Sequence, residues 1–346
     1  MRIGFRRIGR AAFCTLFAVA LLVAMAQTGT AVVRPLALVT DVSGAIQSAQ
    51  RQFNAGNYSG AIKTLQSAVA QDANNAEAQY WLARSYYELR DYDNAITAGE
   101  KAVALDSKNS VYHQWLGRIY GGKADRDRSF SYARKVKKEF EEAVRLNPSN
   151  IAARRDLEEY CIEAPFIVGG SKDEARSQVE AIAALDPVQG HMARAMYELN
   201  ASKKPDLAEK EYREVLNANP RDMDAYFDVI MFFIHQNKPA DVETTIQAAT
   251  QMNPNDTRLA YARGVSRVLS GTDLPRAEQY LKSYLASTPD RSDWPSHAGA
   301  REWLGRLYEA EGKRAEAAEQ YRAALQLDPG RKEAKSRLQK LEKESH

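Results

Sequence analysis

The chain from Trp81 to Asn109 carries apolar and aromatic residues at three- and four-residue spacing, on both sides of a polar break at residues 90–92. In an α-helix, this spacing places the apolar side chains on one face of the helix. A short polar break between two such stretches is typical of a tight turn. The pattern therefore predicts two short amphipathic helices joined by a turn.

The same pattern returns along the chain. Its aromatic motif occurs as Trp81-Leu82-Ala83 with Tyr86, Trp115-Leu116-Gly117 with Tyr120, and Trp303-Leu304-Gly305 with Tyr308. The turn that ends each copy falls at Ala73, Ser107, Pro148, Pro187, Pro220, Pro254, Pro289 and Pro329. A proline there is expected to stop the second helix, because proline lacks a backbone donor and forces the preceding residue out of the helical region.

These residues resemble the tetratricopeptide repeat, whose unit of about 34 residues carries W-x-x-L-G-x-x-Y in one helix and A-x-x-x-F in the next, followed by Pro. This chain departs from the family in placing Trp directly before the Leu-Gly pair. The resemblance implies an all-α fold, a right-handed superhelical α-solenoid of about eight helix-turn-helix repeats. It also implies a concave groove, lined by the first helix of each pair, that holds a peptide segment or helix of another protein.

The repeat positions predict the domain organisation. The expected units are 42–75, 76–109, 110–150, 151–189, 190–222, 223–256, 257–291 and 298–331. A spacer at 292–297 is expected to be a flexible point or a break in the superhelical pitch. Residues 332–346 are charged, with Ala334, Leu338 and Leu341 at helical spacing, which predicts a helix that caps the last repeat.

Residues 1–26 have the pattern of an export signal: four arginines, an apolar run from Ala11 to Met25, and the sequence Ala24-Met25-Ala26. Cleavage would leave Gln27 at the N-terminus and a lead segment at 27–41, and an uncleaved anchor is the alternative. The whole chain has a formal charge of +3, and residues 1–26 contribute +4 to it because they contain four arginines and no acidic residue. The remaining chain thus carries −1, so its charge does not favour nucleic acid or an anionic membrane.

Two units are irregular. The third unit has seven extra residues, expected in or beside its inter-helix turn at 121–128, and the stretch from Lys123 to Lys138 is basic. This stretch is interpreted as the solvated face of a lengthened helix, and contact with a polyanion is the alternative. The fourth unit has an apolar loop from Phe166 to Lys172, interpreted as tucked under a neighbouring helix, with an exposed binding site for a small molecule or substrate as the alternative.

Residues with catalytic or metal-binding chemistry are scattered. The five histidines lie in different units without a second ligand at helical spacing, which argues against zinc. Cys14 lies in the predicted signal, and Cys161 is then a lone thiol interpreted as a buried core residue. The sequence predicts no catalytic residues, no cofactor and no metal site.

The family resemblance implies groove residues at fixed positions of each unit. Carried onto this chain, they are Tyr80, Arg84, Tyr87, Gln114, Arg118, Arg155, Glu159, Phe227 and Met231. Arginine beside aromatic rings is suited to a peptide backbone or carboxylate. Some members of the family grip C-terminal carboxylates with Lys and Asn, but the matching positions here include Ile46, Gln50 and Val111, so this clamp is absent.

The sequence therefore predicts an exported, non-catalytic scaffold of a bacterial-type cell envelope, periplasmic or secreted, whose partner is another protein. An enzyme or small-molecule binder using the loop from Phe166 to Lys172, with Arg154 and Arg155 nearby, is one alternative. A polyanion contact through Lys123 to Lys138 is the other. Membrane contact is expected only through an uncleaved N-terminal segment.

Overall fold

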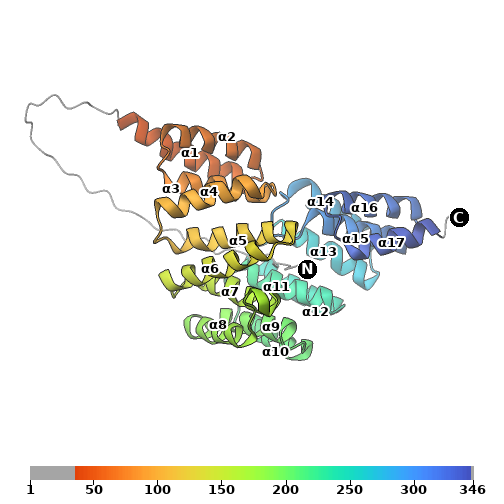
Figure 1. The fold of residues 1–346 in the computed structure, drawn as a ribbon. Coiled ribbons are helices and arrows are strands. Elements are labelled where there is room, and N and C mark those ends of the chain that lie inside the picture. Colours follow the sequence, from red (N-terminus) through yellow and green to blue (C-terminus); the bar gives the residue numbers. More distant parts are fainter. Residues whose placement is uncertain (1–35, 344–346) are drawn as a thin grey trace, which may run out of the picture. The chain divides into compact units, whose positions relative to one another are not determined.

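A computed structural model describes residues 36–343, with side chains from residue 42 onward. Within this range the chain forms seventeen α-helices, one short 3-10 helix and no strand, and successive helices pack side by side (Figure 1). The predicted all-α solenoid of helix pairs is confirmed. The predicted signal segment and lead segment lie outside the described residues, apart from the beginning of the first helix.

The described chain divides into two compact units, and the division falls within α7 (Ile151–Glu163). Unit 1 ends at Asp156 and unit 2 begins at Leu157. The complete helices of unit 1 are α1 (Leu36–Asn54), α2 (Tyr58–Gln71), α3 (Ala76–Glu88), α4 (Tyr92–Leu105), α5 (Ser110–Asp127) and α6 (Phe130–Leu146). Each odd-numbered helix packs against the even-numbered helix that follows it.

Unit 2 continues the series of helix pairs. Its elements after α7 are η1 (Phe166–Val168), α8 (Lys172–Leu185), α9 (Pro187–Asn200), α10 (Pro205–Asn217), α11 (Met223–His235), α12 (Pro239–Met252), α13 (Arg258–Ser270), α14 (Leu274–Ser287), α15 (His297–Ala310), α16 (Arg314–Leu327) and α17 (Lys332–Lys343). The last helix packs on α16, where it buries Ala334 and Leu341.

The helices of each unit form two layers. In unit 1, α3 contacts both α1 and α5, and in unit 2, α13 contacts both α11 and α15. The first helices of successive pairs thus lie next to one another and form one layer, while the second helices cover their other side. The second helices bury short side chains, such as Ala61, Ala68 and Ala95, with no exposed surface, which lets the paired backbones approach closely.

The small residue of the aromatic motif has a packing role. A Cβ atom added at Gly117 would lie 2.4 Å from the ring of Phe140, and one added at Gly305 would lie 2.5 Å from the ring of Tyr321. Both rings belong to the second helix of the same pair and are fully buried. Glycine therefore makes room for an aromatic ring between the two helices.

The seven extra residues of the third pair were predicted in or beside its inter-helix turn, and the structure places the extra length in the two helices on either side of that turn. Helix α5 has 18 residues and α6 has 17, whereas α3 and α4 have 13 and 14. Gly121 and Gly122 continue α5, because a glycine at 122 leaves space for the ring of Tyr92, which a Cβ would approach to 2.4 Å. The lengthened helix expected from the sequence is therefore present.

The junction between α8 and α9 also differs from the expectation. Pro187 begins α9 instead of ending a turn, and Asp186 is the only residue between the two helices. Proline fits the first position of a helix because its backbone donor would have no partner there. The Asp186 side chain accepts hydrogen bonds from the backbone N–H groups of Val188 and Gln189, and its own N–H donates to Ile182 O.

Candidate partner-binding face

Buried polar and charged side chains of the described chain gather on the first helices of the pairs. They are Gln79, Arg84, Ser85, Ser110, His113, Gln114, Lys123, Arg155, Asp156, Glu158, Glu159, Arg258, Ser266 and Glu302, with Thr245 and Thr288 as exceptions on other elements. A buried charge costs roughly several kcal/mol unless the structure supplies partners for it. The first-helix layer therefore contains polar groups that are held in place, whereas the second helices bury mostly apolar ones.

Arg84 lies at the centre of the most aromatic part of this layer. Its guanidinium carbon is 4.3 Å from the ring centre of Trp81, 4.4 Å from Trp115, 4.6 Å from Phe53 and 5.5 Å from Tyr80. These rings come from α1, α3 and α5, so three successive pairs contribute to one site. Arginine over an aromatic ring gains about 0.5–2 kcal/mol when it is desolvated. We call these five residues the Arg84 cluster.

Aromatic rings continue from the Arg84 cluster toward solvent. Tyr80 stacks on Tyr112 at 5.0 Å, and Tyr87 meets Trp115 edge-on at 5.9 Å. Tyr80 and Trp115 are buried, whereas Trp81, Tyr87 and Tyr112 are half-buried and pack against them. We call these five residues, Tyr80, Trp81, Tyr87, Tyr112 and Trp115, the aromatic face.

Charged groups flank the aromatic face at one end. Burial, together with the nearby carboxylates of Glu77 and Asp106, raises the pKa of Tyr112 to about 12. Both acidic residues lie at least partly in solvent, and Glu77 accepts a hydrogen bond of 3.1 Å from the Gln50 amide of α1. This end of the face is therefore acidic.

A polar network holds the other side of α5. The Arg118 guanidinium donates two hydrogen bonds to the carboxylate of Asp156, at 2.7 and 2.8 Å, and the Gln114 amide donates a third at 2.7 Å. Arg118 also stacks on Trp115, at 5.0 Å from its ring centre. The Asp156 carboxylate is thus saturated by two α5 side chains, so it fixes them in position.

The arginine of this motif recurs in unit 2. Trp-Leu, a small residue and Arg occur at 81–84, 115–118 and 303–306, and Arg306 lies 3.9 Å from the ring centre of Trp303. The third copy lacks the aromatic surroundings, because glutamates occupy the positions of Tyr80 and Tyr87. Glu302 binds Arg331 at 2.6 Å, and Glu309 binds Arg337 of α17 at 2.9 Å.

A second arginine of unit 2 fixes the spacer before α15. Arg258 pairs with Asp224 at 2.5 Å and with Asp256 at 2.7 Å, and its guanidinium carbon lies 5.0 Å from the Trp294 ring centre. The Tyr284 hydroxyl donates a hydrogen bond of 2.5 Å to Pro295 O. The spacer at 292–297 is therefore fastened to α13 and α14 through Trp294 and Pro295.

The predicted groove residues fall into two classes of burial. Tyr80, Arg84, Gln114, Arg155, Glu159 and Phe227 are buried, while Tyr87, Arg118 and Met231 are half-buried. The structure brings Tyr80, Arg84 and Tyr87 together around Trp115, and Gln114 and Arg118 together around Asp156. In unit 2, Phe227 lies under Arg258 at 4.6 Å and Met231 packs on the apolar core.

Trp81, Tyr112 and Trp115 are the members of the aromatic face that the groove positions did not include. The sequence contained a signal for two of them, because each Trp lies three residues before an Arg in the repeated motif. That spacing places the two side chains on the same side of a helix. Tyr112 had no such signal, since its partner Tyr80 belongs to the preceding pair.

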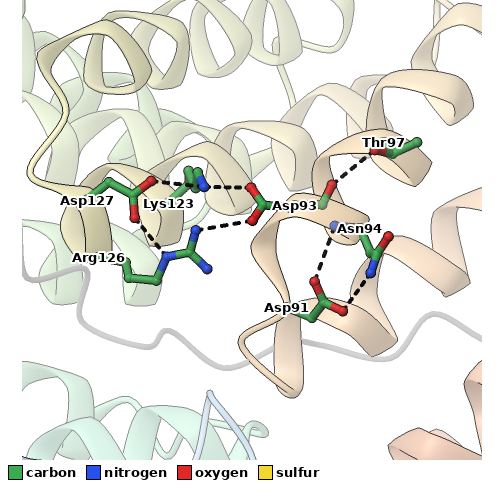
Figure 2. A network of polar contacts seen from close by, with 7 residues as sticks. All are labelled: Asp91, Asp93, Asn94, Thr97, Lys123, Arg126 and Asp127. Carbon is green, nitrogen blue, oxygen red and sulfur yellow. Dashed lines mark hydrogen bonds and ion pairs between the residues drawn. The ribbon is translucent and has the colours of Figure 1, made fainter.

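The basic stretch from Lys123 to Lys138 is largely compensated by acids. Figure 2 shows Lys123 between Asp93 of α4 and Asp127, at 2.5 and 2.9 Å, and Arg126 beside the same two carboxylates. The hydrogen bonds from Arg126 and Lys123 lower the pKa of Asp127 to about 2. These cations bind α5 to the beginning of α4, which favours the solvated-helix interpretation over a polyanion site.

The apolar loop after α7 is only partly tucked in. Val168 is buried and its carbonyl accepts a hydrogen bond of 2.6 Å from the Tyr160 hydroxyl, but Phe166 is 91% exposed and Ile167 is 66% exposed. Lys172 donates to Ala201 O at 2.6 Å, so the end of the loop is fastened to the end of α9. The expected tucking is wrong for Phe166 and Ile167, because the three-residue 3-10 turn has only one inward position.

His113 connects two helices behind the aromatic face. Its Nδ1 lies 2.6 Å from the Glu139 carboxylate and its Nε2 lies 3.1 Å from Ser107 O. Because both neighbours are acceptors, they favour the doubly protonated imidazolium, and the Glu139 hydrogen bond raises the pKa of His113. Among residues 36–343, no group of three His, Cys, Asp or Glu side chains could hold a metal ion.

The tetratricopeptide-repeat family profile matches residues 46–110 and 269–332. The chain contains tetratricopeptide repeats. The first repeat segment includes Arg84 and the α3 part of the aromatic face, and the second includes Trp303 and Arg306. No helix in the described range is long and apolar enough to cross a bilayer.

No curated protein matches the chain. Several solved structures are similar. A tetratricopeptide-repeat protein of Thermus thermophilus is 21% identical with a TM-score of 0.46, covering 56% of this chain and 98% of that one. The APC/C heterotetramer Cut9–Hcn1 is 12% identical with a TM-score of 0.49, covering 89% and 57%. The first repeat domain of Spaghetti (RPAP3) bound to the HSP90 peptide SRMEEVD is 20% identical with a TM-score of 0.32, covering 35% and 90%.

Proposed function

We propose that this protein is an exported, non-catalytic scaffold of the cell envelope that holds a segment of another protein on the aromatic face of unit 1. The observation that carries the proposal is the half-burial of Trp81, Tyr87 and Tyr112 against a rigid base of Tyr80 and Trp115. Tetratricopeptide repeats as a family are protein-binding modules, which supports a protein partner.

Aromatic rings in this setting are suited to bind a partner at low entropic cost. Tyrosine and tryptophan have two side-chain torsions, and here these torsions are fixed by neighbouring rings, so little freedom remains to be lost on binding. Such anchors carry most of the binding energy in protein interfaces. The Arg118–Asp156 ion pair and the Arg84 cluster stabilise the base of the face, so the rings are held ready for a partner.

The export part of the proposal rests on residues 1–26, with their arginines, apolar run and Ala-x-Ala sequence. Mass spectrometry of the protein recovered from envelope and culture fractions tests it. A mature chain beginning at Gln27 is expected. A chain that retains Met1 and sediments with membranes would establish the uncleaved anchor instead, and recovery from the cytoplasm alone would overturn the export proposal.

The binding part is tested by affinity capture from envelope extract. The replacements Tyr87→Ser and Tyr112→Ser together are expected to abolish capture of the partner, because they remove two of the three half-buried rings and leave the Arg84 cluster intact. Replacing Arg84 or Arg118 is a poor test, because both arginines belong to buried clusters and their loss would damage the fold.

The matched control is Tyr132→Ser with Tyr280→Ser, which removes two half-buried tyrosines from the second helices α6 and α14. Circular dichroism must show equal helix content in both double variants. Capture that survives the loss of Tyr87 and Tyr112 but fails in the control would place the binding surface on the second helices and refute the proposal.

A further inference from the structure

The arginine of the repeated Trp-Leu-small-Arg motif binds a carboxylate in one of its copies. In the second copy, Arg118 lies over the ring of Trp115 and donates two hydrogen bonds to the Asp156 carboxylate, at 2.7 and 2.8 Å. Asp156 belongs to α7, the helix that follows this pair. The second copy therefore shows which group suits an arginine stacked on this tryptophan: a carboxylate presented by a neighbouring segment.

The third copy has a cation where the second has that carboxylate. Arg337 of α17 corresponds to Asp156 of α7, because each lies eight residues after the proline in the turn that precedes its helix. The Arg337 guanidinium binds Glu309 at 2.9 Å and Glu333 at 2.7 Å. No hydrogen bond or ion pair joins Arg306, the arginine of this copy, to another residue of the described range, although its guanidinium lies over a ring as in the second copy.

Arg306 lies in a row of side chains that faces the segment after α16. Glu302 is four residues before Arg306 and Glu309 is three residues after it, so the three side chains share one side of α15. Both glutamates bind arginines of the following segment, at 2.6 and 2.9 Å. Arg306 is half-buried between them along the helix, with its guanidinium carbon 3.9 Å from the ring centre of Trp303.

The charge of Arg306 is poorly compensated. Burial and the nearby Arg337 disfavour the cation and lower the pKa of Arg306. A guanidinium group has five N–H donors in one plane and binds a carboxylate through two parallel hydrogen bonds. The ring of Trp303 covers one face of this plane and leaves the donors at its edge for a ligand. A carboxylate would supply both the acceptors and the opposite charge.

We infer that Arg306, stacked on Trp303, is a binding site for a carboxylate of a partner protein, supplied by an acidic side chain or by the end of the partner chain. The carboxylate takes the place at Arg306 that Asp156 takes at Arg118. This site belongs to unit 2 and goes beyond the proposed function, which concerns the aromatic face of unit 1. The two are therefore tested separately.

Three short N-acetylated alanine peptides test the site on the full-length protein. One is amidated and has a central glutamate, the second is amidated and has glutamine in that place, and the third has a free C-terminal carboxylate and no acidic side chain. Binding is followed through the NMR signal of the Trp303 indole N–H, assigned with Trp303→Phe. The glutamate peptide is expected to bind at least about tenfold more tightly than the glutamine peptide.

The third peptide identifies the source of the carboxylate. If it binds more tightly than the glutamate peptide, the site prefers the end of a chain, and if it binds less tightly, the site prefers an acidic side chain. Either result supports a carboxylate site, provided that the bound peptide exceeds the glutamine peptide by about tenfold.

Variants assign the preference for glutamate over glutamine to Arg306. Arg306→Leu should remove it, and Arg306→Lys should keep only about threefold, because lysine retains the charge but lacks the two parallel donors. The matched control is Arg301→Leu, which removes another half-buried arginine of α15, one that donates to Gln320 Oε1 at 3.2 Å. The control should keep the full preference, and circular dichroism must show equal helix content in all variants.

Equal binding of the glutamate and glutamine peptides, or an unchanged preference in Arg306→Leu, would overturn the inference. An equal loss of preference in Arg301→Leu would show a general attraction to positive charge and would overturn it as well. The proposed function has its own readout in the capture experiment. Capture that depends on Tyr87 and Tyr112 leaves the scaffold function standing even if no peptide distinguishes Arg306 from leucine.

Discussion

The motif Trp-Leu-small-Arg occurs in both units, but its surroundings differ. At residues 81–84 the neighbouring pairs contribute Phe53 and Trp115, and Tyr80 and Tyr87 extend the rings toward solvent. At residues 303–306 glutamates occupy the two tyrosine positions and bind Arg331 and Arg337. The motif itself fixes how the helices pack. The two positions that differ, Tyr80 or Glu302 and Tyr87 or Glu309, decide whether this face presents aromatic rings or binds arginines near the C-terminus of the chain.

The largest expected effect comes from giving unit 1 the glutamate of unit 2. Tyr80→Glu removes a ring from the Arg84 cluster and places a carboxylate there, with Arg84 as its neighbouring cation but without an arginine in the position of Arg331. Loss of the ring packing together with incomplete pairing of the buried carboxylate should destabilise the fold by about 3–5 kcal/mol. Urea unfolding should show this loss, with Tyr80→Phe close to the wild type as the control. A loss below about 1 kcal/mol would mean that the neighbouring helices can rearrange to hydrate the charge.

The next prediction concerns the small residue of the motif. Gly117→Ala and Gly305→Ala should each destabilise the protein by about 1–3 kcal/mol, because the added Cβ meets a buried ring. Ala83→Gly, at the same repeat position, should cost only about 1 kcal/mol through helix propensity. Thermal unfolding of the three variants checks the order. Equal losses would show that the close ring contact contributes nothing.

The two arginines should also differ. Arg84→Leu removes a cation packed among four rings and should cost about 1–2 kcal/mol. Arg306→Leu should cost less, about 0.5 kcal/mol or below, because burial and the nearby Arg337 disfavour the charge of Arg306 and lower its pKa. The comparison of unfolding midpoints is the measurement. A larger loss of stability in Arg306→Leu than in Arg84→Leu would contradict the interpretation that the aromatic surroundings of Arg84 stabilise its charge more strongly.

The last prediction depends on pH. His113 in unit 1 corresponds to Arg301 in unit 2, which serves as the matched comparison. The folded-state pKa of His113 is raised, so its stabilisation is fully present below the unfolded value of about 6.5 and is lost as pH rises through the folded value. His113→Gln should therefore cost about 1 kcal/mol near pH ~5.5 and less near pH ~8.5. The loss in Arg301→Gln should be the same at both values, and a pH-independent loss at His113 would contradict the assigned pairing.

The sequence predicted the helix pairs well, because their signals are local. Alanines at helical spacing, and the turn residues after each pair, most of them prolines, are recognised from nearby residues alone. The aromatic face was predicted in part: Tyr80, Arg84 and Tyr87 meet as expected, but their depth of burial depends on rings from α1 and α5. The sequence placed the extra residues in or beside the turn without deciding between them, because Gly121 and Gly122 are typical turn residues. The packing of Gly122 against Tyr92 within a continuous helix is seen only in the structure.

Asp186 has a consequence for how the array comes apart. In a repeat array, stability is approximately the sum of the stability of each repeat and the coupling between neighbours. Most junctions here have several residues between helices, so one pair can fray while the next persists. At this junction, the Asp186 side chain accepts hydrogen bonds from the first turn of α9, and the Asp186 N–H donates a hydrogen bond to the last turn of α8. Both helix ends therefore depend on the same residue. Partial unfolding that begins at either terminus should therefore pause at this junction, and the two repeats that share it should open together as one cooperative unit.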